Sequence, residues 1–236
     1  MQEFRAQFLE RIERTKTVVS FRFKPEKDVD FTAGQFVQFF LKESDKTDKS
    51  LNKYLSFSCA PGKEYIEVTK RISESDFSKR LLSLKKNDSI LLKGPLGHCV
   101  LDPAFQKVAF LIGGIGITPV ISILEQVADK KIKVDALLLY SNMRDDDIAF
   151  KHELDAWAKE NANIRVLYMV VSCVVDNSRC FEGMITKDFV LQQMPDYKER
   201  AFYLFGPPAM VSAMKAICQD IGCDMGKIKT ESFIGY

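Results

Sequence analysis

The stretch VAFLIGGIGITPVISIL, residues 108–124, decides how the second half of this chain folds. It carries no charge, and its 17 residues reach the lower limit for a membrane-spanning helix. Three glycines and a proline interrupt it, which favours a buried strand, a glycine-rich turn and the start of a helix. Pro119 suits the first turn of that helix, where a missing backbone N–H is harmless.

Outward from this stretch, apolar strands alternate with helices to the end of the chain. Further strands are expected at 134–141, 164–172 and 201–206. Helices are expected at 119–130, 146–161, 184–194 and 208–222. Nearly continuous apolar strands joined by helices predict a parallel sheet that is covered on both faces.

The residues before 101 follow a different pattern. Short runs rich in Val, Phe, Ile and Tyr predict strands at 18–23, 36–41, 54–58, 65–72 and 89–93. Only residues 76–86 have helical spacing, so this half is predicted to be an antiparallel barrel or sandwich. The Gly- and Pro-containing segment 94–107 suits a boundary, and we expect domains at 1–101 and 102–236.

Composition limits the possible functions. The 34 Lys and Arg nearly balance the 32 Asp and Glu, so the net charge of +2 argues against general nucleic-acid binding. Six cysteines and two histidines show no zinc or iron–sulfur spacing, so no metal site is expected. The charged N-terminal stretch lacks the pattern of a signal peptide, and we expect a cytoplasmic protein with reduced thiols and no transmembrane segment.

Two glycine corners follow predicted parallel strands, at 113–119 and at 205–210. Glycine lets the backbone approach a ligand, and a helix start offers N–H groups to phosphate oxygens. Ligands bind outside the carboxyl ends of the strands in open parallel sheets, so both corners are candidates for one crevice. The alternative is a tight strand–helix turn at the first corner, or a stiff loop at the second, without a ligand.

A third candidate segment lies in the first half. The strand around Lys53 places hydroxyls at Ser56 and Ser58 on one face beside a cation, a combination suited to phosphate. An ordinary half-buried strand has the same pattern. Ser78 is predicted to N-cap the following helix, either as a simple cap or beside a pyrophosphate.

The order of these segments resembles the ferredoxin–NADP reductase superfamily. Four motifs carry the resemblance: GQF at 34–36, LSFS at 55–58, GGIGITP at 113–119 and FGPPAMV at 205–211. The resemblance extends over almost the whole chain, from residue 30 to 236. It implies an N-terminal antiparallel β-barrel that binds flavin, followed by an α/β parallel-sheet domain that binds nicotinamide nucleotide.

The resemblance also implies which residues of the barrel bind flavin, expected to be FAD rather than FMN. The family's Arg-x-Tyr-Ser strand corresponds to Lys53, Tyr54, Leu55 and Ser56. Lys53 keeps the charge but lacks the bidentate guanidinium, and Leu55 replaces the stacking aromatic. The remaining flavin-binding candidates are Val68, Thr69, Lys70, Asp76, Phe77, Ser78 and Tyr236.

A second set is implied for the nicotinamide nucleotide. It comprises Gly113, Gly114, Gly116, Thr118, Pro119, Ser141, Asn142, Arg144, Gly206, Pro207, Pro208 and Met210. Many relatives carry Arg where Met143 stands, while Arg144 lies beside it. The choice between a ribose 2′-hydroxyl and a 2′-phosphate therefore stays open.

The catalytic candidates that the resemblance implies shape a slot for the reacting rings. They are Thr118, Phe205 and Glu231, and Phe205 replaces the family's Cys. This ring either narrows the nicotinamide slot or only repacks it. Asp145, Asp146 and Asp147 are expected to open a helix rather than to bind a metal.

The function implied is electron transfer from NAD(P)H through bound FAD to a one-electron acceptor such as ferredoxin or flavodoxin. A separate protein or a small acceptor such as a quinone would receive the electrons. The alternative is a flavin-binding electron-transfer subunit with little nicotinamide activity, and a third possibility is a flavin-free binding protein. Absorption spectra and bleaching by NADH or NADPH distinguish the three.

Overall fold

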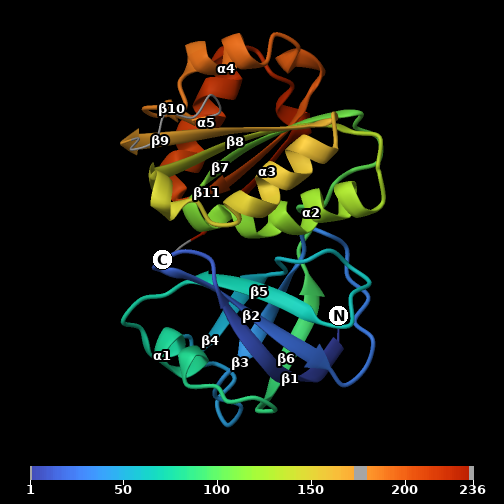
Figure 1. The fold of residues 1–236 in the computed structure, drawn as a ribbon, viewed down its shortest axis with the longest axis vertical. Coiled ribbons are helices and arrows are strands. Elements are labelled where there is room, and N and C mark those ends of the chain that lie inside the picture. Colours follow the sequence, from blue (N-terminus) through green and yellow to red (C-terminus); the bar gives the residue numbers. More distant parts are fainter. Residues whose placement is uncertain (1, 173–179, 234–236) are drawn as a thin grey trace. The chain divides into compact units, whose positions relative to one another are not determined.

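The computed structural model describes residues 2–172 and 180–233. The chain forms two compact units (Figure 1). One takes residues 2–100 together with 118–126, and the other takes 101–117 and the described chain from 127 onward. The domain boundary between 101 and 102 stays a prediction.

The first unit contains one antiparallel sheet, as predicted. Its strands are β1 (Gln2–Glu13), β2 (Val18–Pro25), β3 (Phe36–Phe40), β4 (Asn52–Ser56), β5 (Ile66–Arg71) and β6 (Ser89–Leu96). Their order is β4-β3-β6-β1-β2-β5. The predicted strands were found, but β1 was missed because its charged residues obscure the pattern. Phe4, Ala6 and Phe8 alternate along β1 and are buried in the core of this unit, with at most 5% of their surface exposed.

The two outer strands of this order, β4 and β5, approach each other beyond the end of β4. Phe57 forms an isolated bridge with Val68, and the Ser58 N–H donates to the Glu67 carbonyl at 2.8 Å. We call this junction, residues 53–58 and 66–70, the barrel seam. Buried Phe21, Phe39 and Phe57 lie in the core behind it.

A single described helix, α1 (Asp76–Leu82), belongs to the barrel part of the sequence. Its N-cap is Ser75, whose Oγ accepts the Ser78 N–H at 3.3 Å. The prediction that Ser78 caps the helix was wrong. Ser75 has the extended backbone that a cap requires, whereas Ser78 lies within the first turn and its hydroxyl accepts the Ser73 N–H.

The second unit contains the predicted parallel sheet. Its strands are β7 (Lys107–Gly113), β8 (Asp135–Arg144), β9 (Ile164–Ser172), β10 (Cys180–Glu182), β11 (Ala201–Gly206) and β12 (Ile228–Ser232). The order is β10-β9-β8-β7-β11-β12, with parallel pairing throughout. Short β10 lies in a segment that was expected to be a loop.

Helices cover both faces of this sheet, as Figure 1 shows. The helices of the chain's second half are α2 (Ile117–Asp129), α3 (Lys151–Glu160), α4 (Lys187–Gln193) and α5 (Pro208–Asp220). Leu137 and Leu139 share a core cluster with Val190 of α4 and Met214 of α5. Tyr168 donates its hydroxyl to Asp155 of α3 at 2.9 Å from the other face. Among the described helices, none has the length and hydrophobicity needed to cross a bilayer.

The acidic run after β8 does not open a helix, so that prediction was wrong. Asp145–Asp147 forms a separate 3-10 turn, η2, and α3 begins only at Lys151. Between them Phe150 adopts a left-handed backbone with φ of 60°. Ile148, Ala149 and Phe150 are buried, which separates the acidic turn from the helix.

Candidate functional site

The glycine corners lie together at the carboxyl edge of the parallel sheet. A Cβ on Gly113 would lie 2.2 Å from the Met210 Sδ, and one on Gly116 would lie 2.6 Å from the Phe205 carbonyl oxygen. A Cβ on Gly206 would lie 3.1 Å from the backbone nitrogen of Gly113. Packing between the ends of β7 and β11 therefore requires these glycines, whether or not a ligand binds.

The chain leaves this corner through a short 3-10 turn, η1 (Gly114–Gly116), and enters α2 at Ile117. Gly114 has a φ of 51°, a conformation that glycine adopts without strain. Thr118 is buried, and Pro119 lies in the first turn as expected. The Ile117 N–H donates to the Gly114 carbonyl, so η1 runs directly into α2.

Asn142 supplies the clearest sign of a missing partner at the same edge. Gly113 of β7 pairs with Ser141 of β8, which places Asn142 one residue beyond the glycine corner. The Asn142 side chain is buried, with the residue only 6% exposed, yet neither its amide nitrogen nor its oxygen has a hydrogen-bond partner. Buried amides are nearly always hydrogen-bonded in folded proteins. A ligand at this edge would satisfy the amide.

Phe205 does not line this edge. Its ring is fully buried and meets Tyr203 edge-on, with 6.0 Å between centroids and 82° between planes. Phe205, which replaces the family's Cys, was expected either to narrow the nicotinamide slot or only to repack it. The observed burial agrees with repacking. Glu231 pairs with Phe205 in the β11–β12 register, and burial raises the pKa of its carboxyl.

The second glycine corner continues directly into α5. Pro207 is the N-cap and Pro208 the first helical residue, where its missing N–H is tolerated. Met210 packs against Gly113. Ser141 and Arg144 lie near the end of β8, and the Arg144 Nε donates to the Asp146 Oδ1 at 3.0 Å.

In the first unit, β4 presents side chains that differ sharply in exposure. Lys53 is exposed, and Tyr54 has 54% of its surface exposed while its ring meets Phe36 edge-on at 5.7 Å. Leu55 is buried in the barrel core and Ser56 is buried at the strand end. The exposed aromatic of this strand is therefore Tyr54, one residue before the position that the resemblance indicates.

Across the barrel seam, β5 buries a lysine. Lys70 is 4% exposed, and its Nζ donates to the Arg71 carbonyl at 3.0 Å. Burial, and then the charge of Lys53, lower the pKa of Lys70 to about 8. Val68 belongs to the core cluster. Two lysines from neighbouring strands thus place positive charge at one point of the seam, which favours an anionic partner.

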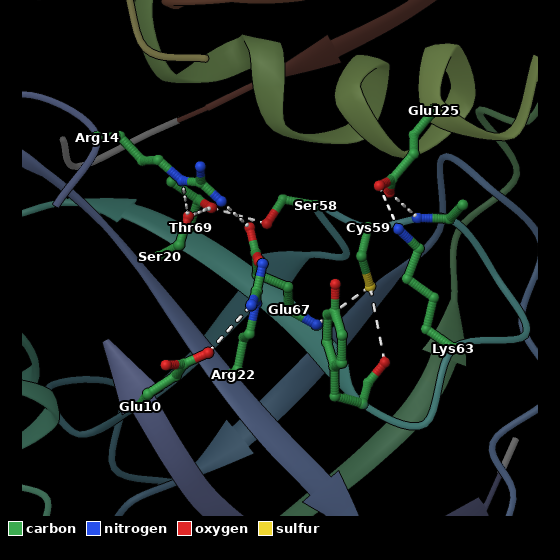
Figure 2. Close-up of polar contacts among 12 residues, drawn as sticks. Glu10, Arg14, Ser20, Arg22, Ser58, Cys59, Lys63, Glu67, Thr69 and Glu125 are labelled. Carbon is green, nitrogen blue, oxygen red and sulfur yellow. Dashed lines mark hydrogen bonds and ion pairs between the residues drawn. The ribbon is translucent and has the colours of Figure 1, made fainter. Parts of the chain in front are cut away.

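A hydrogen-bonded network fixes the same seam (Figure 2). The Thr69 hydroxyl lies 2.7 Å from the hydroxyls of both Ser20 and Ser58. The Arg14 Nε donates to Ser20 at 2.8 Å, and its terminal nitrogen donates to Glu67 at 2.9 Å. Sequence analysis did not find this network, although Glu67 and Thr69 flank the apolar Val68 on one strand face.

The second oxygen of Glu67 is also paired. Arg22 donates its Nε to Glu67 at 2.8 Å and a terminal nitrogen to Glu10 at 3.0 Å. The Glu67 side chain is 3% exposed. One buried carboxylate is therefore held between two guanidinium groups, which keeps the middle of β5 in a fixed position.

Helix α2 contacts the loop that follows the barrel seam. The Ser122 hydroxyl donates to the Cys59 carbonyl at 2.6 Å. Figure 2 shows Glu125, which accepts the Ala60 N–H at 2.5 Å and pairs with Lys63. These contacts explain why residues 118–126 group with the barrel.

The remaining flavin-binding candidates of the barrel lie in or near α1, apart from Tyr236. Phe77 is fully buried and meets Phe39 edge-on, and Ser78 is buried among the serines that cap α1. Asp76 is exposed in the first turn of α1. Tyr236 lies outside the described residues, so its predicted role stays a prediction.

Comparison with known proteins agrees with this architecture. Residues 110–216 match the family model for the oxidoreductase NAD-binding domain. The ferredoxin–NADP+ reductase of Neisseria gonorrhoeae, solved with bound FAD and NADP, superposes with a TM-score of 0.78 at 19% identity, over 98% of this chain and 99% of that one. The resemblance to the ferredoxin–NADP reductase superfamily is confirmed.

Other relatives of this chain have diverse names. It is 28% identical to a flavohemoprotein of Bacillus subtilis (strain 168) over 93% of its own length and 56% of the relative's. It is also 28% identical to NADH-cytochrome b5 reductase 1 of Ajellomyces capsulatus, over 89% and 73% of the two chains. The cytochrome b5 reductase domain of Ulva prolifera nitrate reductase superposes with a TM-score of 0.83 at 20% identity, over 98% and 97%. The chain thus spans little more than half of the flavohemoprotein.

The structure shows where the residues that depart from the superfamily's pattern lie. Leu55 and Phe205 are both buried, so neither side chain offers an exposed surface to a ligand. Lys53 keeps an exposed cation on β4. In the first unit Tyr54 and Lys53 are exposed, and in the second the buried Asn142 amide has no hydrogen-bond partner.

Proposed function

We propose that this chain is an NAD(P)H-dependent flavoprotein oxidoreductase that uses FAD and passes electrons to a separate one-electron acceptor. The observation that carries the proposal is the unpartnered, buried amide of Asn142 at the carboxyl edge of a parallel sheet. Because a buried amide without a partner is unfavourable, its retention beside the glycine corner supports a nucleotide as the missing partner.

The barrel seam supports the flavin half of the proposal. Lys53 and Lys70 would hold a phosphate group of the cofactor, and Tyr54 would offer a ring face. Ser56 is buried at the end of the same strand as Lys53 and Tyr54. The buried Lys70 costs stability in the absence of an anion, since its protonated form is disfavoured. An anionic cofactor would reverse that penalty.

When bound, FAD accepts a hydride from the reduced nicotinamide and releases electrons one at a time. The chain's own contribution is to bind and orient. The Glu67 network holds the middle of β5, the strand that carries Lys70, between two arginines. Gly116 allows η1 to pack directly on the backbone of Phe205, which fixes the entry to α2.

The acceptor is proposed to be a one-electron carrier such as a ferredoxin or a flavodoxin. Because the relatives include an NADH-cytochrome b5 reductase, the acceptors to be tested extend beyond ferredoxin. A panel of ferredoxin, flavodoxin, cytochrome b5 and a quinone, each reduced under identical conditions, ranks them.

The decisive experiment joins two spectra. The purified protein is mixed with FAD or FMN, freed of excess cofactor, and its visible absorption recorded before and after anaerobic NADH or NADPH. Retained FAD that is bleached by a nicotinamide nucleotide supports the proposal. Retained FAD without bleaching favours the electron-transfer subunit, and failure to retain either flavin contradicts the flavin assignment.

A charge-reversal pair sharpens this experiment. Lys53→Glu places a carboxylate beside Lys70 and is expected to lower flavin retention about tenfold or more, because it replaces attraction for phosphate by repulsion. Lys24→Glu makes the same change at an exposed position of β2 and is expected to retain flavin. Equal retention by both variants would show that the seam does not hold the phosphates.

A further inference from the structure

Helix α5 ends in a turn that brings two cysteines together. Ile221 is the C-cap, and Gly222 follows with a φ of 78°, a conformation that favours glycine. The Gly222 N–H donates to the Gln219 carbonyl at 3.1 Å. The Cys223 N–H donates to the Cys218 carbonyl at 2.9 Å. These two hydrogen bonds make up the Schellman motif, in which the side chains at the two ends of the longer bond commonly touch.

The two thiols of this turn face each other within the second unit. Cys218 is fully buried and Cys223 is 7% exposed, and both belong to the core cluster that includes Met214 of α5. A side-chain hydrogen bond joins the two thiol groups, and both cysteines are free. Because a hydrogen bond also links their backbones, the two Cα atoms lie no more than about 7 Å apart, which a disulfide can span.

We propose that Cys218 and Cys223 are a redox-active pair, which hydrogen peroxide closes into a disulfide that ties the end of α5 to the chain leading into β12. The Cys223 thiolate attacks one peroxide oxygen, the O–O bond breaks, and a sulfenic acid forms as hydroxide leaves and takes up the thiol's proton. The Cys218 sulfur then attacks the oxidised sulfur, so that the S–S bond forms as the S–O bond breaks. The two thiols lose two electrons and two protons, and the peroxide leaves as two molecules of water.

Cys223 takes the first step because it is the less deeply buried of the two. Its neighbours Gly222 and Asp224 are exposed, so local opening of this turn brings its sulfur to solvent. Burial raises the pKa of both thiols, that of Cys218 to about 12. The hydrogen bond from Cys218 opposes this rise in the pKa of Cys223. Since the thiolate is the reacting form, Cys223 is the nucleophile and Cys218 the resolving thiol.

Cys59 in the first unit is a buried thiol of a different kind. It is 2% exposed, and burial raises the pKa of its thiol to about 12. Its sulfur accepts the Glu67 N–H at 3.1 Å and donates to the Tyr65 carbonyl at 4.0 Å. Both of these partners are backbone groups, with which no disulfide can form. Cys59 therefore matches the pair in burial and lacks the facing thiol, which makes it the internal control.

Peptide mapping tests the disulfide directly. Lys215 and Lys227 flank the pair, so trypsin places both cysteines on one peptide, residues 216–227. The full chain is treated with hydrogen peroxide, unfolded, alkylated and digested, and the peptides are weighed by mass spectrometry. The wild-type peptide is expected to resist alkylation and to be lighter than its reduced form by two hydrogen atoms. Dithiothreitol is expected to restore alkylation of both cysteines, while Cys59 is alkylated throughout.

Met225 on the same peptide reports whether peroxide has reached the turn. It is 40% exposed, and peroxide converts a methionine to its sulfoxide. The peroxide concentration is therefore raised until Met225 is oxidised. Alkylation of both Cys218 and Cys223 at that concentration would overturn the inference. So would oxidation of either one to a sulfinic acid in place of the disulfide, or a cross-link to any other cysteine.

Two variants and one unfolding measurement complete the test. In Cys223→Ala the attacking thiol is absent, so Cys218 is expected to be alkylated after the same treatment, whereas Cys59→Ala is expected to form the disulfide as the wild type does. Thermal unfolding is followed by the fluorescence of Trp157, which lies in α3 of the second unit. Because a disulfide restricts the unfolded chain, oxidation should raise the wild-type midpoint by about 3 °C or more relative to its effect on Cys223→Ala. An equal shift in these two proteins would overturn the tie between α5 and β12.

Discussion

The barrel and the parallel sheet treat their buried polar groups differently. In the barrel, Glu67 is held by two arginines and the hydroxyls beside it bond one another. At the carboxyl edge of the sheet, the Asn142 amide is buried without a partner. A complete network fixes a fold, whereas an uncompensated group points to a partner from outside the chain. The comparison suggests which polar residues to alter for stability and which for binding.

The largest effect is expected from breaking the complete network. Glu67→Gln leaves Arg14 and Arg22 with part of their positive charge uncompensated in a buried place, and it should lower the free energy of unfolding by about 3 to 5 kcal/mol. Glu43→Gln removes an exposed partner of Arg5, with side chains 40% and 42% exposed, and should leave the free energy of unfolding nearly unchanged. Urea titration followed by circular dichroism measures both. Similar losses of unfolding free energy in the two variants would mean that the buried network stabilises the fold no more than an exposed ion pair.

The next effect tests the packed glycine corner. Gly116→Ala places a Cβ 2.6 Å from the Phe205 carbonyl oxygen and should destabilise the second unit by about 2 to 3 kcal/mol. Trp157, the single tryptophan, lies in α3 and reports on this unit through its fluorescence. Gly62→Ala, at a positive φ with no atom within 4 Å, is the strain-only control and should cost about 1 kcal/mol. An unchanged fluorescence transition in Gly116→Ala would contradict the packing explanation.

Lys70 gives a smaller effect with a defined pH window. Its pKa falls from 10.5 to about 8 in the folded state, so the folded protein is penalised below pH 8 and relieved as the pH rises toward 10.5. Lys70→Met should therefore stabilise the flavin-free protein by about 2 kcal/mol at pH 7, and the gain should disappear near pH 10.5. Unfolding measured across pH 7 to 10.5 tests this window. The same variant should retain less flavin, and a gain independent of pH would refute the titration.

The smallest stability change is expected at Asn142, with a larger change in binding. Asn142→Leu removes two unpartnered polar atoms and should leave the free energy of unfolding unchanged or raise it by up to about 1 kcal/mol. Its affinity for ADP should fall about tenfold, since the amide would no longer bond the nucleotide. Calorimetry and thermal unfolding of one sample give both numbers. A destabilised variant with normal ADP affinity would mean that Asn142 serves the fold alone.

Sequence reasoning found the architecture because apolar runs and helical spacing are local signals. The parallel strands and the two glycine corners at their carboxyl ends followed from them, whereas Asn142 was implied only by the family resemblance. It missed β1, where charged residues alternate with Phe4, Ala6 and Phe8. It also placed the helix cap at Ser78 instead of Ser75, because neighbouring serines satisfy the same local rule.

The rest depended on contacts between distant residues. Burial of Glu67 requires Arg14 and Arg22 from other strands, and no local pattern announces that pairing. The glycines were interpreted as open to either a ligand or a tight turn. Only the approach of Met210 to Gly113, and of the Phe205 backbone to Gly116, showed that chain packing favours glycine at both positions. The cofactor contacts of the individual site residues remain predictions.

The grouping of residues 118–126 with the barrel affects how the chain can be divided. A fragment that ends at residue 101 would remove Ser122 and Glu125 from the Cys59 carbonyl and the Ala60 N–H. A recombinant in which a related sequence replaced everything after residue 101 would receive a different α2. That helix would not have evolved to contact the loop at residues 59–63. The part of the chain that belongs with the barrel is therefore discontinuous, because it includes residues 118–126. Changes in α2 and in residues 59–63 are expected to accompany one another during evolution.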